Sequence, residues 1–337
     1  MKKIFINACN CHQGGGKTLL DAFISGIENQ NYYYIFYIDT RYNPSNIYNQ
    51  NITFKKISII KRLLVSFMIK KQAKKNDIII FFGNLPPLLN FKNLNVILLL
   101  SNRFYVDSIS FKGFDFRGII KIKLEKLYFN LFKTNVSEFI VQTNTMKNLL
   151  QNCLSNNYKI QVLPFENSFI REDEIFFKQK NTFIYVASLI PYKNHKKLLY
   201  AWNKLNNAGI SVKLYLTIDQ HNDIKDWIKK FINENKLNVI LLENISRSEL
   251  MNIYKSCEYL IFPSYFEAYG LPLIEAVNYK LKILAADVDY CWDLITPNDF
   301  FNPHDASSIE RCILRALEMK TPKADILNPK DFINKII

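Results

Sequence analysis

The stretch "YLIFPSYFEAYGLPLIEA", residues 259–276, holds a strand, a loop and the start of a helix in one continuous run. Its first four residues are aromatic or branched and predict a buried β-strand. Gly270 permits backbone angles that other residues avoid, and Pro272 suits the first turn of a helix. The loop is expected to expose the Glu267 carboxylate, and a second carboxylate, Glu275, follows in the helix with seven residues between them. The pattern therefore predicts two acidic groups near the carboxyl end of a strand.

This arrangement suits a ligand that carries both phosphates and hydroxyl groups. The amides of a loop and of a helix N-terminus bind a pyrophosphate, and carboxylates accept hydrogen bonds from sugar and ribose hydroxyls. The structural alternative is a capping Glu267 and a solvent-facing Glu275. The complete string favours the binding site over that alternative.

Strands alternate with helices along the whole chain, which predicts two doubly wound α/β domains. A polar stretch at residues 166–181 separates the two series. Ligands bind at the carboxyl ends of parallel strands, so we expect a cleft between the domains to hold the site. The expected units are a basic N-terminal domain (1–168), a C-terminal domain (169–322) and a final segment (323–337) that packs back on the first domain. The expected strands are 3–7, 33–38, 78–82, 95–100 and 138–142 in the first half, and 182–187, 212–218, 238–242, 259–262 and 282–286 in the second.

A second glycine-rich segment, "CHQGGGKTLL" at residues 11–20, follows the first predicted strand. It is not a Walker A loop, because Cys11 occupies the place of the leading glycine. Strand, glycine loop and helix still direct backbone N–H groups toward an anion. The alternative is a tight turn that only needs the backbone freedom of glycine. This segment alone leaves both interpretations open.

Composition indicates an ordinary globular protein. The 337 residues are 49% hydrophobic and 22% charged, and no apolar run approaches eighteen residues. The first residues, MKKIFINACN, read as a strand rather than a leader, so we expect a cytoplasmic protein. Cys9 and Cys11 lack a second pair of ligands, so we expect neither a metal site nor a disulfide framework.

The positive charge is confined to the first half of the chain. Residues 1–165 hold 22 Lys and Arg against 8 Asp and Glu, whereas residues 166–337 hold 22 of each class. A predicted basic helix begins at Lys55 and ends at Lys75, with eight basic residues and no acidic one. Such a helix suits an anionic membrane surface, although a helix with one core face and one solvated face has the same pattern. No nucleic-acid motif accompanies the charge, so we expect no nucleic-acid partner.

The segment 259–276 resembles the E-x7-E signature of retaining glycosyltransferases of family 4, which have the GT-B fold. Glu267 and Glu275 fill its two positions. Further segments resemble the same family, including "FIYVASLIPYKNHKKLLYAW" around Lys193 and "EFIVQTNTMKNLL" at residues 138–150. The resemblance covers nearly the whole chain and is looser from residue 40 to 135.

The resemblance implies a role for each matching position. Lys193 corresponds to the lysine that contacts the donor phosphates. Glu275 corresponds to the ribose ligand, and Glu267 to the group that binds hydroxyls of the transferred sugar. No cofactor and no metal are implied, since the nucleotide sugar is a substrate. The implied backbone contacts with the diphosphate and sugar come from Gly14, Gly15, Gly16, Ala268, Tyr269, Gly270 and Leu271.

Two departures from the family pattern affect the expected site. Ser188, which we expect among the donor-binding residues, stands where the family has an arginine, so Lys193 would bind the phosphates with less help. Many members have a histidine after a middle strand of the first domain, where this chain has Asn102 and Arg103. We expect these two residues to contact donor or acceptor.

The expected function is transfer of a sugar from a nucleotide sugar to a lipid-linked glycan, with retention of configuration. The setting implied by the family is lipopolysaccharide, O-antigen or capsule synthesis, with the protein peripheral on the inner face of the cytoplasmic membrane. Three alternatives remain: a non-catalytic nucleotide-sugar-binding protein, a nucleotide-sugar epimerase and a nucleic-acid-binding protein. The sequence does not indicate the base, the sugar, the linkage or the oligomeric state.

Overall fold

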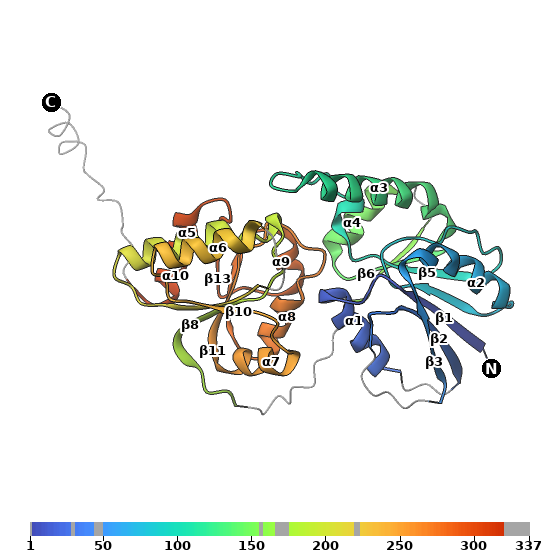
Figure 1. Cartoon of the computed structure of the whole chain (residues 1–337), viewed down its shortest axis with the longest axis horizontal. Helices are drawn as coiled ribbons and strands as arrows, with labels where there is room; N and C mark the ends of the chain where they lie inside the picture. The colour runs from blue at the N-terminus through green and yellow to red at the C-terminus, as the bar shows by residue number, and fades with distance from the viewer. Residues whose placement is uncertain are drawn as a thin grey trace.

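The computed structural model of the protein describes residues 2–27, 31–43, 50–154, 158–165, 175–218 and 223–319. These residues form two α/β domains side by side, each built on one parallel sheet (Figure 1). The apolar strand runs of the sequence account for this, because strands covered by helices on both faces must be apolar on both faces.

The first domain contains a seven-stranded sheet in the order β3-β2-β1-β4-β5-β6-β7, with every pair parallel. Helices pack on both faces of this sheet. The strands are β1 (Lys2–Ala8), β2 (Tyr32–Asp39), β3 (Ile52–Ile57), β4 (Ile78–Phe81), β5 (Asn95–Leu99), β6 (Glu138–Val141) and β7 (Lys159–Val162). The helices are α1 (Gly14–Ser25), α2 (Val65–Gln72), α3 (Phe116–Phe132) and α4 (Asn144–Cys153), with short 3-10 turns η1 (Ile59–Leu64), η2 (Arg103–Tyr105) and η3 (Lys133–Asn135).

The second domain contains a six-stranded parallel sheet in the order β10-β9-β8-β11-β12-β13. The strands are β8 (Gln179–Tyr185), β9 (Lys213–Thr217), β10 (Val239–Leu242), β11 (Cys257–Phe262), β12 (Lys282–Ala286) and β13 (Asp299–Phe301). The helical elements are η4 (Pro191–Lys193), α5 (His195–Asn207), α6 (Asp223–Glu234), α7 (Arg247–Ser256), α8 (Leu271–Asn278), α9 (Asp289–Leu294) and α10 (Ala306–Ala316).

The strand order reverses once in each sheet, at β1/β4 and at β8/β11. Such a switch point opens a crevice at the carboxyl ends of the strands, where ligands bind in open α/β sheets. The loop after β1 leads into α1, and the loop after β11 leads into α8. The topology therefore brings both glycine-containing segments of the sequence to the cleft between the domains.

Several contacts join the domains. The guanidinium of Arg103 in η2 reaches the carboxylate of Asp289 in α9 with two bonds of 2.8 and 2.7 Å. The carboxylate of Asp293 accepts a hydrogen bond of 2.6 Å from the amide of Thr145 at the start of α4. The Thr143 hydroxyl donates to the Ala268 carbonyl at 3.3 Å. These contacts fix the spacing between the two sheets.

The structure corrects several boundaries expected from sequence. Strands β3, β7 and β13 were not predicted, and the expected basic helix is interrupted because Lys55 belongs to β3 and is followed by η1. The expected linker is also too long, since β8 already begins at Gln179. The predicted domain boundary at 168/169 and the final segment 323–337 lie outside the described residues.

Within the described part of the chain, no helix is both long enough and apolar enough to cross a membrane.

Candidate active site in the interdomain cleft

A cleft of about 1610 Å³ separates the two domains and is lined by residues of both. A small-molecule pocket is usually no larger than about 1000 Å³, so this cleft has room for two substrates. Every residue that the sequence singled out as a donor or acceptor contact lines it: Gly14, Gly15, Gly16, Asn102, Arg103, Ser188, Lys193, Glu267, Ala268, Tyr269, Gly270, Leu271 and Glu275.

The N-terminus of α1 opens into this cleft. Gly14 has a φ of +58°, a left-handed conformation that favours glycine, and it starts the helix immediately after Gln13. No side chain caps the helix, so its first N–H groups keep their capacity to bind an anion. A Cβ atom placed on Gly15 would lie 3.5 Å from Cδ1 of Leu271, so this loop approaches the opposite domain closely.

Helix α8 begins on the other side of the cleft. Its N-cap, Gly270, has a φ of +78°, and no side chain caps this helix either. Pro272 occupies the first turn, as the sequence predicted. A Cβ atom on Gly270 would lie 3.2 Å from Cδ1 of Leu273, which is tighter than an ordinary contact. Glycine is therefore required here for both its conformation and its size.

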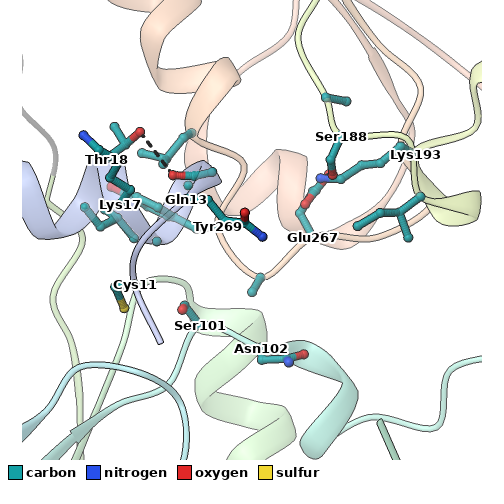
Figure 2. Close-up of a pocket in the computed structure, with 18 of the residues that line it drawn as sticks. Cys11, Gln13, Lys17, Thr18, Ser101, Asn102, Ser188, Lys193, Glu267 and Tyr269 are labelled. Carbon is teal, nitrogen blue, oxygen red and sulfur yellow. Dashed lines mark hydrogen bonds and ion pairs between the residues drawn. The ribbon is translucent and has the colours of Figure 1, made fainter. Parts of the chain in front are cut away.

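Lys193 and Glu267 meet in the cleft, as Figure 2 shows. The ammonium of Lys193 lies 2.5 Å from Oε1 of Glu267, and the two side chains are 14% and 10% exposed. Burial lowers the pKa of Lys193, but the Glu267 carboxylate and the Tyr192 phenol group outweigh burial and raise it above its ordinary value. Lys193 is thus a buried, charged ammonium. Glu267 is not the exposed loop carboxylate that the sequence suggested, because this ion pair covers it.

Glu275 is buried in α8 and pairs with Arg247, whose Nη1 atom lies 2.7 Å from its Oε1 atom. Arg247 is the first residue of α7, a helix whose N-terminus is fixed by a capping box of Ser246 and Glu249. Burial lowers the pKa of Arg247, and Glu275 reverses this effect and raises it. Arg247 also lines the cleft. No pattern in the sequence indicates Arg247, since only the folded chain brings positions 247 and 275 together.

Asn102 and Arg103 line the cleft but already have protein partners. The Asn102 side chain accepts a hydrogen bond from the Phe104 amide and caps η2. The Arg103 guanidinium bonds to Asp107 through Nε at 2.7 Å and to Asp289 through both terminal nitrogens. Arg103 therefore joins the domains, and its predicted contact with donor or acceptor stays a prediction.

The other notable residues of the glycine segment serve the first domain. Lys17 pairs with Asp21 one turn later at 2.6 Å and lies over the ring of Tyr42. The buried Cys11 thiol donates to the Phe82 carbonyl at 3.2 Å, and burial raises its pKa to about 12. The pairing of Lys17 does not suggest a phosphate-binding Walker lysine, and the raised pKa of Cys11 does not suggest a reactive thiol. Among the described residues, no group of three or more His, Cys, Asp or Glu is arranged to hold a metal ion.

Gln142 is a cleft residue that sequence reasoning did not identify. It follows β6, lines the cleft and is only 2% exposed. Neither its amide oxygen nor its amide nitrogen has a hydrogen-bond partner among the described residues. A buried amide without partners is costly, so a group that enters the cleft is the natural partner for it. Its only sequence signal was a polar residue at the end of the predicted strand 138–142.

Arg62 brings a further positive charge to the cleft from η1. It pairs with the fully buried Asp39, the last residue of β2, and donates to the Asn10 side chain at 3.2 Å. The hydrogen bond from Arg41 outweighs burial and, with Arg62, lowers the pKa of Asp39 far below its usual range. Asp39 therefore holds Arg62 in place at the edge of the cleft.

This architecture of two parallel-sheet domains around a cleft is the GT-B fold, and known structures confirm it. The lipopolysaccharide outer core galactosyltransferase WaaB aligns with a TM-score of 0.63 and 16% identity, over 100% of this chain and 99% of that one. The Anabaena protein HepE in complex with UDP-glucose aligns with a TM-score of 0.66 and 14% identity, over 94% of this chain and 90% of that one. At these identities the similarity establishes the fold alone.

Sequence comparison adds a domain assignment. Residues 166–330 match the family described as "Glycosyl transferases group 1". The "Serotype-specific mannosyltransferase WbdA" of Escherichia coli is 34% identical over 109 residues, which cover 32% of this chain and 13% of that protein. The chain thus matches only a small part of this curated relative.

Proposed function

We propose that the protein is a glycosyltransferase that moves a sugar from a nucleotide sugar to a glycan during synthesis of a cell-surface polysaccharide. The family match of residues 166–330 supports this activity. The similarity to a serotype-specific mannosyltransferase supports the setting of lipopolysaccharide, O-antigen or capsule.

One observation carries the proposal: the Lys193–Glu267 pair lies in the same cleft as the uncapped N-termini of α1 and α8. In glycosyl transfer the nucleoside diphosphate leaves with growing negative charge. A buried ammonium and fixed amides stabilise such charge without reorganisation. When a diphosphate binds, it would replace Glu267 as the partner of Lys193, and Glu267 would be free to accept hydrogen bonds from the sugar.

The remaining groups fit the rest of the donor. Glu275 would bind the ribose hydroxyls, held in place by Arg247. The amides of residues 268–270 would contact the transferred sugar. Positive charge at the diphosphate comes from Lys193 and helix ends, so the proposed reaction needs no metal ion. The departing phosphate would accept the proton of the acceptor hydroxyl on the same face of the sugar, which retains the anomeric configuration.

The acceptor is proposed to be lipid-linked and to reach the protein at the inner face of the cytoplasmic membrane. The net charge of the first half supports this, as do the exposed apolar residues Ile59, Ile60 and Leu63 of η1 beside Lys61 and Arg62. Anionic lipids attract clustered basic residues, and exposed apolar side chains add affinity.

The test is a transfer assay with labelled UDP-, GDP-, ADP- and dTDP-sugars and a lipid extract as acceptor source. We expect transfer from one donor class, with the product in the anomeric configuration of the donor by NMR. Binding of a donor without transfer or hydrolysis would favour the non-catalytic alternative. Conversion of the free nucleotide sugar to its epimer would favour an epimerase. Salt-dependent RNA or DNA binding, indifferent to nucleotide sugars, would instead indicate a nucleic-acid-binding protein.

A further inference from the structure

Helix α3 carries a continuous apolar stripe on its solvent side. Five large side chains are exposed along it, and Phe116 is the most exposed at 76%: Phe116, Ile120, Leu124, Leu127 and Leu131. Successive residues of an α-helix are rotated by about 100°, so these five fall within an arc of about 80°. Monomeric proteins seldom leave such a surface without a partner.

The opposite side of α3 attaches the helix to the first domain. Phe129 is fully buried, and Glu125 accepts a hydrogen bond of 3.0 Å from the hydroxyl of Tyr105. The ammonium of Lys126 donates to the Asp107 carbonyl at 2.8 Å. Since these contacts already attach α3 to the first domain, the exposed stripe is not needed for the packing of the core. Figure 1 shows α3 along the upper edge of the first domain.

Basic residues border the stripe on both sides. Arg117 and Lys123 are exposed, and each lies about 20° outside one edge of the stripe when measured about the helix axis. The exposed Lys121 lies at a larger angle from the stripe, beyond Arg117. Glu125, the acidic residue of this helix, is on the inner side and bonded to Tyr105. An apolar strip with cationic borders matches the interface of an anionic bilayer, where acyl chains meet negatively charged headgroups.

We propose that the α3 stripe inserts into the surface of an anionic membrane and presents the cleft to that surface. The inner side of the same helix lines the cleft through Gly118 and Ile122, so a docked α3 would place a lipid-linked acceptor beside its entrance. The placement of a lipid-linked acceptor beside the cleft rests on the proposed transferase function, whereas membrane binding by α3 does not. A second copy of the chain fits the stripe less well, because a two-fold contact would bring Arg117 and Lys123 near their own copies.

The test is co-sedimentation of the full-length protein with vesicles of phosphatidylcholine, with and without 30% phosphatidylglycerol (roughly the charge at which basic segments bind). The variant Leu124→Ser/Leu127→Ser removes the centre of the stripe. The control is Ile175→Ser/Phe177→Ser, which changes two apolar residues before β8 that are even more exposed than Leu124 and Leu127. A charge variant, Arg117→Glu/Lys123→Glu, tests the borders. All of these side chains are exposed, so the variants should fold, and circular dichroism checks that.

We expect wild type and control to bind the anionic vesicles, and the stripe variant to bind at least about tenfold more weakly. The charge variant should lose binding mainly at low salt. Equal binding by the stripe variant, or no binding by wild type, would overturn the proposal. Self-association of wild type that the stripe variant loses would assign the stripe to a second copy. Vesicle binding needs neither donor nor acceptor, so it can succeed if the proposed transfer fails. Conversely, donor hydrolysis by the stripe variant without lipid should equal that of wild type.

Discussion

At the residue scale, the proposed chemistry of the cleft depends on the Lys193–Glu267 pair. Each group is buried, and each compensates the charge of the other. Removal of one member of a buried ion pair leaves an uncompensated charge, which is more costly than removal of both. Substitution of one or both members should therefore affect stability and catalysis differently.

Lys193→Met should lower the free energy of unfolding by roughly 3–5 kcal/mol, because it leaves the Glu267 carboxylate buried and unpaired. Lys193→Met/Glu267→Gln should recover most of that loss. Both variants should lose donor turnover by about 100-fold or more, since each lacks the cation at the leaving phosphate. Urea unfolding and nucleotide-release kinetics separate the two effects. Retained turnover in the folded double variant would contradict the catalytic assignment of Lys193.

Gln142 gives a second residue-scale prediction. Its buried amide lacks partners among the described residues, so Gln142→Leu should leave stability unchanged or raise it by about 1 kcal/mol. Turnover should nevertheless fall if that amide meets the substrate in the cleft. Thermal unfolding and kinetics on the same preparation test both parts. A strongly destabilised variant would indicate that Gln142 serves the core instead.

At the scale of elements, the conformation of Gly270 positions the N-terminus of α8. Gly270→Ala should lose about 1–2 kcal/mol of stability through its left-handed backbone and should also lose activity, because the new Cβ atom meets Leu273. Gly209→Ala is the matched control, since Gly209 has a φ of +73° with open space around it and does not line the cleft. It should lose similar stability and keep full activity. Loss of activity in both variants would mean that stability alone explains the effect.

The start of α5 predicts a pH dependence. Burial, together with the charge of Lys193, lowers the pKa of His195 to about 3, whereas an unfolded histidine has a pKa of about 6.5. Below that value the unfolded chain binds a proton that the folded chain refuses, so stability falls as the pH falls. The slope from this residue approaches about 1.4 kcal/mol per pH unit between roughly pH 6 and 5.

The measurement is urea unfolding across this pH range for wild type, His195→Gln and the exposed control His304→Gln. We expect the first variant to reduce the slope and the control to keep it. An unchanged slope in His195→Gln would show that His195 does not stay neutral in the folded protein.

Elements with a strong local pattern were predicted from the sequence, whereas elements that depend on contacts with distant residues were missed. The long apolar run before Pro263 and the pair Gly270-Leu271 predicted β11 and α8 closely, because both the burial and the turn require those residue types. Strand β3 was missed because its ITFKKI sequence carries two lysines and merges into a basic segment. Pairing with β2 decided its conformation, and that contact is not visible locally.

At the scale of the whole molecule, the Arg103–Asp289 contact links the two domains at the cleft. Asp289 is 44% exposed, so the pair contributes no more than about 1 kcal/mol. It can still bias the spacing of the domains, because it is one of the contacts that join them across the cleft. No sequence pattern could have predicted this pair, or that of Arg247 and Glu275, since each depends on how complete elements are placed. The same limit explains why Glu267 was expected to be exposed.

Asp289→Asn should therefore alter the distribution of domain spacings without unfolding either domain. Small-angle scattering should show a larger radius of gyration than wild type, and donor should reduce the difference. Asp299→Asn is the matched control, because Asp299 makes a similar two-bond contact with Arg315 inside the second domain, at 2.7 and 2.9 Å. An equal change in both variants would rule out a role for Asp289 in domain spacing.

The central claim is that the cleft binds a nucleotide sugar through groups of both domains. The most direct measurement is the thermal shift of wild type, Lys193→Met and Glu275→Gln with UDP-, GDP-, ADP- and dTDP-sugars. The account predicts a rise in the melting temperature of wild type with one nucleotide class, and a smaller or absent rise in both variants. A shift that persists in both variants would place the nucleotide elsewhere, and no shift with any donor would contradict the proposed site.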